Sequence, residues 1–195
     1  MKNAKTGLFF GSFNPVHTGH LILANYFTEH TDLDEVWFVL TPHNPLKQRK
    51  NLLPDYHRLY LLRLALESYE KFQVSTVEFD LPRPNYTVVT LAHLQDIHPE
   101  KRFVPLMGQD TLATLPKWKN YEEILKNHEI YVYPRRTNLK AELLSHPRVR
   151  FFGEAPIVEI SASQIRKDIK SGKNVRPYLP EKVFDYIQEM NFYKK

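Results

Sequence analysis

A short segment near the start of the chain holds the residues that are best suited to chemistry. It reads Gly11-Ser-Phe-Asn-Pro-Val-His17-Thr-Gly19-His20 and follows an apolar run. Gly11 lacks a Cβ, which lets backbone or a ligand approach closely. If a helix begins near Thr18, the imidazoles of His17 and His20 fall on one side of its first turn. Two imidazoles beside helix N-terminal amides form a neutral-to-cationic cradle for phosphate.

The same histidines allow a structural interpretation, in which His17 caps the helix and His20 packs in an interface. The order Gly, Pro, His, Gly, His at a strand–helix junction favours the phosphate cradle. The segment does not match the GxGxxG dinucleotide fingerprint. It is not a P-loop either, because GxxxxGK[ST] occurs nowhere in the chain. We expect no protein-bound metal, since no third His or Cys lies at suitable spacing and HExxH is absent.

A second segment, Ser161-Ala-Ser163-Gln-Ile-Arg166, places two hydroxyls and a guanidinium at a predicted helix start. A serine before a helical run is a common N-cap, which explains the segment without any ligand. Oriented amides, hydroxyl donors and a guanidinium fork together also make a phosphate clamp. Both interpretations stay open for this segment by itself.

Apolar strand-like runs alternate with helix-length segments of 3.6-residue spacing. The predicted strands are Thr6–Phe10, Val36–Leu40, Gln73–Val77, Phe103–Met107, Ile130–Tyr133 and Val149–Phe152. The predicted helices are Gly19–His30, Tyr56–Ser68, Val88–Asp96, Tyr121–Asn127, Leu139–Ser145, Ser163–Lys170 and Pro180–Met190. This alternation predicts an α/β fold: a doubly wound, Rossmann-like parallel sheet with helices on both faces and a small C-terminal helical piece. In such a sheet, loops at the carboxyl ends of the strands build the ligand crevice.

Composition bounds the class of protein. A chain of 195 residues, 42% hydrophobic and 25% charged, predicts a single domain over residues 1–195, with its C-terminal helical part at roughly 161–195. The absence of cysteine excludes disulfides, Cys-ligated metals and a thiol nucleophile. Met1–Lys5 is polar, unlike a signal peptide, and no stretch approaches the ~20 apolar residues that cross a bilayer. We therefore expect a cytoplasmic protein without a membrane partner; a homo-oligomer is compatible with the sequence.

The net charge of +5 is unevenly distributed. Residues 1–97 carry 9 Lys and Arg against 10 Asp and Glu, whereas residues 98–195 carry 18 against 12. A basic half can attract nucleic acid, an acidic membrane or a polyphosphate ligand, or it can be a solvated face. Between Arg135 and Arg176 the only aromatic residues are Phe151 and Phe152, which read as strand core. Because RNA-binding surfaces interleave aromatic with basic residues, we expect no nucleic-acid partner.

The pattern GxFxPxHxGH after the first strand resembles the signature of the nucleotidyltransferase superfamily, which includes nicotinate-nucleotide, pantetheine-phosphate and cytidylyl transferases. The second segment resembles that superfamily's ISxTxIR element, with Ser163 in the Thr place. Paired, the two motifs are a strong signal. The resemblance implies an ATP site made of Gly11, Ser12, Phe13, His17, His20, Gly108, Ser161, Ser163 and Arg166.

Three middle segments, Asn85-Tyr86-Thr87, Gly108-Gln109-Asp110 and Leu115-Pro-Lys-Trp118-Lys119, bear on the second substrate. Thr87 or nearby amides could cap a helix or bind an anion, and Asp110 suits ribose hydroxyls or a helix start. Trp118 either packs in the core or stacks on a flat ring. The segments resemble the PSYT, GxD and LPKW elements of the nicotinate-nucleotide adenylyltransferase branch, and the resemblance spans about residues 6 to 193. It implies an acceptor site made of Tyr86, Thr87, Asp110, Trp118 and Lys119.

The chain departs from that branch at three places. Where the branch has PPHK, this chain reads Thr41-Pro-His43-Asn-Pro-Leu46-Lys47. Lys47 can still supply a phosphate-binding charge, while Leu46 replaces the histidine and His43 is a candidate substitute. Asn14 stands for a commoner Asp, and Gln109 for a commoner Ala.

The resemblance implies adenylyl transfer from ATP to nicotinate mononucleotide, a step of NAD biosynthesis. A phosphate monoester, with a second pKa of about 6, is largely ionised near neutral pH and needs no general base. We therefore expect catalysis by positioning and charge neutralisation, through His17, His20, Lys47, Arg166 and an Mg²⁺ ion held mostly by the phosphates. The alternatives are the same chemistry on nicotinamide mononucleotide or pantetheine phosphate, and a nucleotide- or RNA-binding module without activity.

Overall fold

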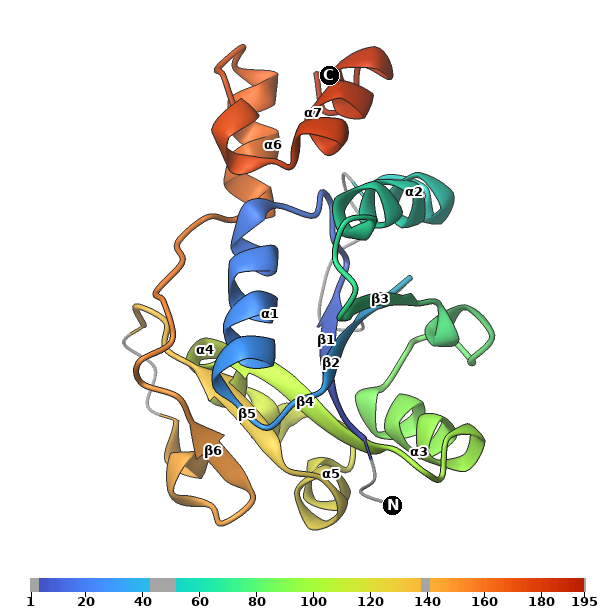
Figure 1. Cartoon of the computed structure of the whole chain (residues 1–195), viewed down its shortest axis with the longest axis vertical. Coiled ribbons are helices and arrows are strands. Elements are labelled where there is room, and N and C mark those ends of the chain that lie inside the picture. Colours follow the sequence, from blue (N-terminus) through green and yellow to red (C-terminus); the bar gives the residue numbers. More distant parts are fainter. Residues whose placement is uncertain (1–3, 43–51, 138–140, 195) are drawn as a thin grey trace.

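The computed structural model describes residues 4–42, 52–137 and 141–194, and Figure 1 shows the chain. Within these residues six strands form one sheet: β1 (Lys5–Gly11), β2 (Glu35–Leu40), β3 (Phe72–Ser75), β4 (Arg102–Gly108), β5 (Ile130–Tyr133) and β6 (Val149–Phe151). Their order is β3-β2-β1-β4-β5-β6, and every neighbouring pair is parallel. The order reverses between β1 and β4, which confirms the predicted doubly wound, Rossmann-like sheet.

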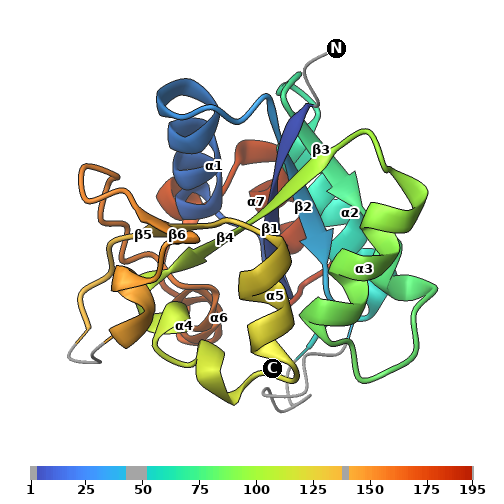
Figure 2. The same ribbon diagram turned by 90° about the horizontal axis from the view of Figure 1, so that it is seen from below.

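Helices cover both faces of this sheet. The α-helices are α1 (Thr18–His30), α2 (Asp55–Leu66), α3 (Thr87–Ile97), α4 (Gln109–Leu112), α5 (Tyr121–Asn127), α6 (Ala162–Lys170) and α7 (Glu181–Glu189). Short 3₁₀ turns are η1 (Val77–Phe79), η2 (Leu115–Lys117), η3 (Glu142–Ser145) and η4 (Arg176–Tyr178). Figure 2 shows α1 on one side of the sheet and α3 and α5 on the other. In the described part of the chain, no helix is long and apolar enough to span a membrane.

Successive strand residues supply two hydrophobic cores, one on each face. Phe9 and Phe38 belong to the core shared with α1, α2, α6 and α7, whereas Leu8 and Val39 belong to the core shared with α3 and α5. A parallel sheet that is covered on both faces buries nearly every strand residue. This is why its strands show in the sequence as continuous apolar runs.

The prediction of a helix at Leu139–Ser145 is wrong. Residues 138–140 lie outside the described residues, and the remainder forms only the 3₁₀ turn η3. Leu143 and Leu144 are partly buried against the edge of one core. Two leucines on a single turn do not provide the apolar face of several turns that stabilises a packed helix.

Two element boundaries also differ from expectation. β3 begins at Phe72 and ends at Ser75, and Val77 starts η1 instead of extending the strand. Pro180 is the N-cap of α7 and not a residue of its first turn, because its ψ of 144° is extended. The short turn η2, which follows α4, was not expected.

The C-terminal helices α6 and α7 stand beyond the carboxyl ends of the strands (Figure 1). Ile165 and Ile169 of α6 and Val183 and Ile187 of α7 are buried in the same core as α1 and α2. The single-domain organisation stays a prediction, which this shared core favours.

Candidate active site

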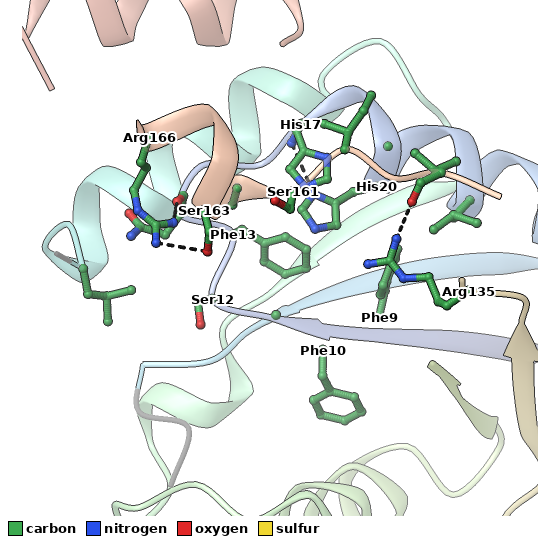
Figure 3. A pocket seen from close by; sticks show the side chains of 18 of the residues that line it. Phe9, Phe10, Ser12, Phe13, His17, His20, Arg135, Ser161, Ser163 and Arg166 are labelled. Carbon is green, nitrogen blue, oxygen red and sulfur yellow. Dashed lines mark hydrogen bonds between the residues drawn. The ribbon is translucent and has the colours of Figure 1, made fainter. Parts of the chain in front are cut away.

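A cavity of about 350 Å³ opens at the carboxyl end of β1, where the strand order reverses. Its walls come from the turn after β1, the start of α1, the chain after β5 and the start of α6 (Figure 3). It brings together most residues that the sequence assigned to ATP: Gly11, Ser12, Phe13, His17, His20, Ser161, Ser163 and Arg166. Lys47, with His43 and Leu46, lies outside the described residues.

The turn after β1 has a strained backbone. Phe13 has a φ of 42°, a left-handed conformation that costs a residue with a side chain roughly 1–2 kcal/mol. Its ring packs against Gly11, where a Cβ would lie 2.8 Å from the ring. The close approach expected at Gly11 is thus made by Phe13. The Phe13 ring also contacts the rings of Phe9, Phe38 and His20, and the centroid of His20 lies 5.1 Å away. The strained turn therefore supports the second histidine.

His17 and His20 lie together at the N-terminus of α1. Their rings are stacked with centroids 3.7 Å apart, which confirms that they share one side of the first turn (Figure 3). His17 is the N-cap residue, and its backbone N–H donates to Nδ1 of His20 at 3.2 Å. Because Nδ1 of His20 accepts, we assign the proton of its neutral ring to Nε2. His20 therefore accepts a hydrogen bond from the N-cap residue of α1 and also lines the cavity.

His17 is uncharged near neutral pH. Its side chain is buried. Burial, and to a lesser extent the positive charge of Arg135, lowers the pKa of His17 to about 4. The sequence predicted a phosphate cradle that is neutral or cationic, and at neutral pH His17 contributes a neutral imidazole to it. A bound phosphate would raise its pKa, because an opposite charge favours the protonated ring.

The lowered pKa of His17 predicts that acid destabilises the fold. Between pH 6.5 and about pH 4 the unfolded chain binds a proton at this residue that the folded chain does not, so stability falls as the pH falls. The full difference corresponds to about 3 kcal/mol. We expect the urea midpoint of the wild type to drop more steeply from pH 7 to 4.5 than that of His17→Asn. Burial also lowers the pKa of His57 and His128, so both proteins lose stability; equal slopes would contradict the prediction.

The start of α6 forms the opposite wall. Ser161 is the N-cap, and its Oγ accepts from the N–H of Gln164 at 3.2 Å, which confirms the capping interpretation for this serine. Ser163 and Arg166 lie one turn apart, and the guanidinium donates to Oγ of Ser163 at 3.4 Å. Arg166 also donates to the carbonyl oxygen of Asn14 at 2.6 Å. A direct hydrogen bond therefore joins the two predicted motifs.

Arg135 also lines the cavity, although the sequence analysis did not single it out. It follows β5, donates through NH1 to the carbonyl oxygen of Val158, and places Nε 3.9 Å from the carboxylate of Asp110. In Figure 3 it lies at the other end of the cavity from Arg166, with the histidines between them. Its place directly after a predicted strand, where the crevice was expected, was the signal that could have identified it.

Gly108 and Asp110 lie beside the cavity. Gly108 is not part of the described lining, but a Cβ there would crowd Asp110, Arg135 and Tyr133. Asp110 occupies the first turn of α4 and faces Arg135. The helix-start interpretation of Asp110 is confirmed, and its role toward a ribose stays a prediction.

A second cavity of about 180 Å³ lies beside the start of α3. Tyr86 and Lys119 line it, and the ammonium of Lys119 sits 4.5 Å from the centroid of the Tyr86 ring. Tyr86 is the N-cap of α3 and Thr87 its first residue, without a side-chain capping bond at the N-cap. The expectation that Thr87 caps this helix is therefore wrong, because the helix begins one residue earlier than predicted, at Thr87 itself.

Trp118 follows η2 and is partly buried against the core that α3 and α5 share with the sheet. Its Nε1 is buried and has no hydrogen-bond partner in the part of the chain that the structure describes. A buried indole N–H normally finds an acceptor. Core packing is thus confirmed for part of the ring, and stacking on a substrate stays a prediction.

The described lining of the larger cavity contains histidines, arginines and hydroxyls but no carboxylate. Across the described residues there is also no group of three or more His, Asp or Glu side chains that could hold a metal ion. Mg²⁺ prefers oxygen ligands in octahedral geometry and is commonly carried by substrate phosphates. The imidazoles, guanidiniums and hydroxyls of this lining therefore suit a magnesium ion that arrives on a phosphate chain.

Comparisons with known proteins identify the family. The cytidylyltransferase-like family matches residues 8–168. A Flavobacterium psychrophilum protein named "probable nicotinate-nucleotide adenylyltransferase" is 55% identical over 193 residues, covering 98% of this chain and 100% of its own length. This chain belongs to the nicotinate-nucleotide adenylyltransferase family. A Bacteroides thetaiotaomicron member with the same name is 45% identical over 185 residues, covering 95% and 91% of the two chains.

The fold of this nicotinate-nucleotide adenylyltransferase family member has a counterpart among solved structures. Plasmodium falciparum nicotinic acid mononucleotide adenylyltransferase, complexed with NaAD, matches it with a TM-score of 0.82 over 98% of both chains, at 18% identity. At that identity the match speaks for the fold alone. The family resemblance seen in the two motifs and the three middle segments is confirmed by the relatives.

Proposed function

We propose that this chain transfers the adenylyl group of ATP to nicotinate mononucleotide, giving nicotinate adenine dinucleotide and pyrophosphate in NAD biosynthesis. The family membership supports this activity. The observation that carries it is the meeting of both phosphate-binding motifs in one cavity, with Arg166 bonded to the turn that leads to the two histidines. Because this hydrogen bond joins the two motifs, the guanidinium, the serine hydroxyls and the two imidazoles surround one cavity, and the cavity has the size of a nucleotide site.

In this reaction an oxygen of the 5′-phosphate of nicotinate mononucleotide attacks the α-phosphorus of ATP. The bond from that phosphorus to the bridging oxygen breaks, and pyrophosphate leaves with the electron pair. The attacking phosphate is already ionised near neutral pH, so no proton has to be removed. What remains for the protein is to align the two phosphates and to neutralise charge on the leaving pyrophosphate.

We assign these tasks to the cavity walls. His20 donates through Nε2 to the phosphate chain at the start of α1, with His17 stacked beside it. Ser161, Ser163 and Arg166 hold the β- and γ-phosphates at the start of α6. Arg135 supplies positive charge from the end of the cavity opposite Arg166. The roles of Lys47 and of Gly108 stay predictions from the sequence.

ATP enters as its magnesium complex. The described lining of the cavity holds no carboxylate, so the phosphates would carry the metal, which would offset their charge. Removing Mg²⁺ with a chelator should stop turnover, although it removes no structural element of the protein.

The smaller cavity at the start of α3 is the place for the nicotinate part of the acceptor. The amides of Tyr86 and Thr87 lie at the N-terminus of an 11-residue helix, which favours a carboxylate. The ammonium of Lys119 adds positive charge at the Tyr86 ring. Trp118, on the neighbouring turn, is assigned to the pyridine ring. Asp110, whose carboxylate lies 3.9 Å from Nε of Arg135, is assigned to the acceptor ribose.

The test is pyrophosphate release with ATP and Mg²⁺, comparing three acceptors. We expect fast release with nicotinate mononucleotide and little with nicotinamide mononucleotide, since a site built to bind one polar group can discriminate by roughly 10⁴. Pantetheine phosphate should give none, because its acyl chain has no flat ring. Release with the amide but not the acid, or with pantetheine phosphate alone, would overturn the acceptor assignment and leave the ATP site in place.

A further inference from the structure

Three side chains from distant parts of the chain hold the turn after β1. Arg58 of α2 donates to the carbonyl oxygen of Ser12 at 2.7 Å. Arg166 of α6 donates to the carbonyl oxygen of Asn14 at 2.6 Å. The hydroxyl of Tyr193, beyond α7, donates to Oδ1 of Asn14 at 2.7 Å. The carbonyl groups of Ser12 and Asn14, the residues before and after Phe13, therefore have long-range partners.

This turn needs such partners because its backbone is strained. Phe13 has a φ of 42°, and a residue in that conformation persists only where its surroundings enforce it. The ring of Phe13 contacts the ring of His20. A turn that relaxes would shift this ring and, with it, the histidine that faces the ATP phosphates.

Packing of the neighbouring residue Phe192 holds Tyr193 in position. Phe192 beside it packs against His57, with ring centroids 4.6 Å apart, and against Tyr186, 5.7 Å apart. Burial raises the pKa of Tyr193, so the hydroxyl stays protonated and acts as a donor. Asn14 lines the ATP cavity, whereas Tyr193 is not part of its described lining. An effect of Tyr193 on ATP is therefore indirect, and its hydrogen bond to Asn14 connects it to the cavity lining.

We propose that Tyr193 is a positioning residue for the ATP site: its hydroxyl holds Asn14, and so keeps the strained turn in the geometry that presents His20 to the phosphates. The proposal rests on the proposed function, because it assigns ATP to that cavity. Oδ1 of Asn14 also accepts from the N–H of Leu53 at 3.2 Å. Loss of the Tyr193 hydroxyl therefore loosens the turn and does not leave this oxygen without a donor.

The test is Tyr193→Phe, which removes one hydroxyl and keeps the ring. Because a hydrogen bond of this kind contributes about two- to tenfold in an equilibrium constant, we expect ATP affinity to fall roughly fivefold. The KM for the acceptor should change less than twofold, since the acceptor cavity lies at α3. ATP affinity is measured by calorimetry with MgATP alone, and both KM values by pyrophosphate release.

Tyr186→Phe is the matched control. Its hydroxyl bonds Nδ1 of His57 at 3.0 Å in the same C-terminal region but does not reach the turn. Both variants should lose a similar, small amount of thermal stability, and only Tyr193→Phe should lose ATP affinity. Equal ATP affinity in the two variants, or equal loss toward ATP and acceptor in Tyr193→Phe, would overturn the proposal.

A double-mutant cycle with Asn14→Ala tests whether Tyr193 acts on the ATP site through Asn14. If Tyr193 acts through Asn14, Tyr193→Phe has no further effect on ATP affinity in the Asn14→Ala background. An undiminished effect in that background would contradict the route. Because the calorimetry needs no acceptor, a wild-type protein that binds MgATP but does not use nicotinate mononucleotide refutes the proposed function alone.

Discussion

Replacing His20 by alanine should lower kcat/KM for adenylyl transfer by about 100-fold or more, the usual cost of losing one transition-state donor. The loss should fall mainly on kcat, because the charge on the pyrophosphate grows as the bond to the α-phosphorus breaks. The ring lies among Phe9, Phe13 and His17, with centroids between 3.7 and 5.6 Å away. Alanine therefore leaves a hole, and thermal melts must accompany the kinetics.

Two amide variants separate the roles of the two ring nitrogens. His20→Asn can keep an acceptor near the position of Nδ1, which receives the N–H of His17. His20→Gln can place an amide donor nearer the position of Nε2. If the phosphate contact is what matters, glutamine restores part of the rate and asparagine does not.

His30→Ala is the control on the same helix, since its ring stacks on Tyr26 far from the cavity lining. It should leave kcat/KM unchanged. Normal turnover by His20→Ala, or better rescue by asparagine than by glutamine, would reject the assigned mechanism.

Replacing Arg166 by alanine should also cost about 100-fold or more in kcat/KM, because in the proposed mechanism the side chain supplies charge to the phosphates. The same side chain also binds the turn after β1. NH1 binds the carbonyl oxygen of Asn14 and NH2 reaches Oγ of Ser163. An ammonium cannot reproduce this fork. Arg166→Lys should therefore recover only a small part of the loss, and the KM for ATP should rise in both variants.

Lys170→Ala tests whether the general positive field explains the effect. Lys170 is an exposed residue one turn further along α6, and its removal takes away the same unit of charge. We expect less than a twofold change in kcat/KM. Rates measured at low and moderate salt check this, because screening weakens a general field more than a direct contact. Equal losses in Arg166→Ala and Lys170→Ala would refute the assigned contact.

The elements of this protein and the two motifs that meet in its candidate active site were predictable from the sequence. The strands of a covered parallel sheet are apolar runs, and this identified all six, although β3 was misplaced by a residue or two. Spacings of three residues determine which side chains share a helical turn. His17 with His20, and Ser163 with Arg166, lie together for that reason.

Helix boundaries were less predictable. The expected helix at Leu139–Ser145 is a 3₁₀ turn in its described part, and Thr87 is inside α3 and does not cap it. Spacing shows that apolar residues could share a face, but only packing against another element makes such a face stable. Lys47 stays a prediction, as do the assignments of Tyr86, Trp118 and Lys119.

Long-range contacts were decided by the tertiary structure alone. The bonds of Arg166 and Tyr193 to Asn14 join residues 152 and 179 positions apart, and Arg135 enters the cavity from the chain after β5. The neutral state of His17 likewise follows from its burial. Chain geometry sets the relations of residues within one turn, so the sequence by itself determined the two motifs. Which distant groups meet, and how much water they lose, depends on how the whole chain packs, and only the folded structure determines it.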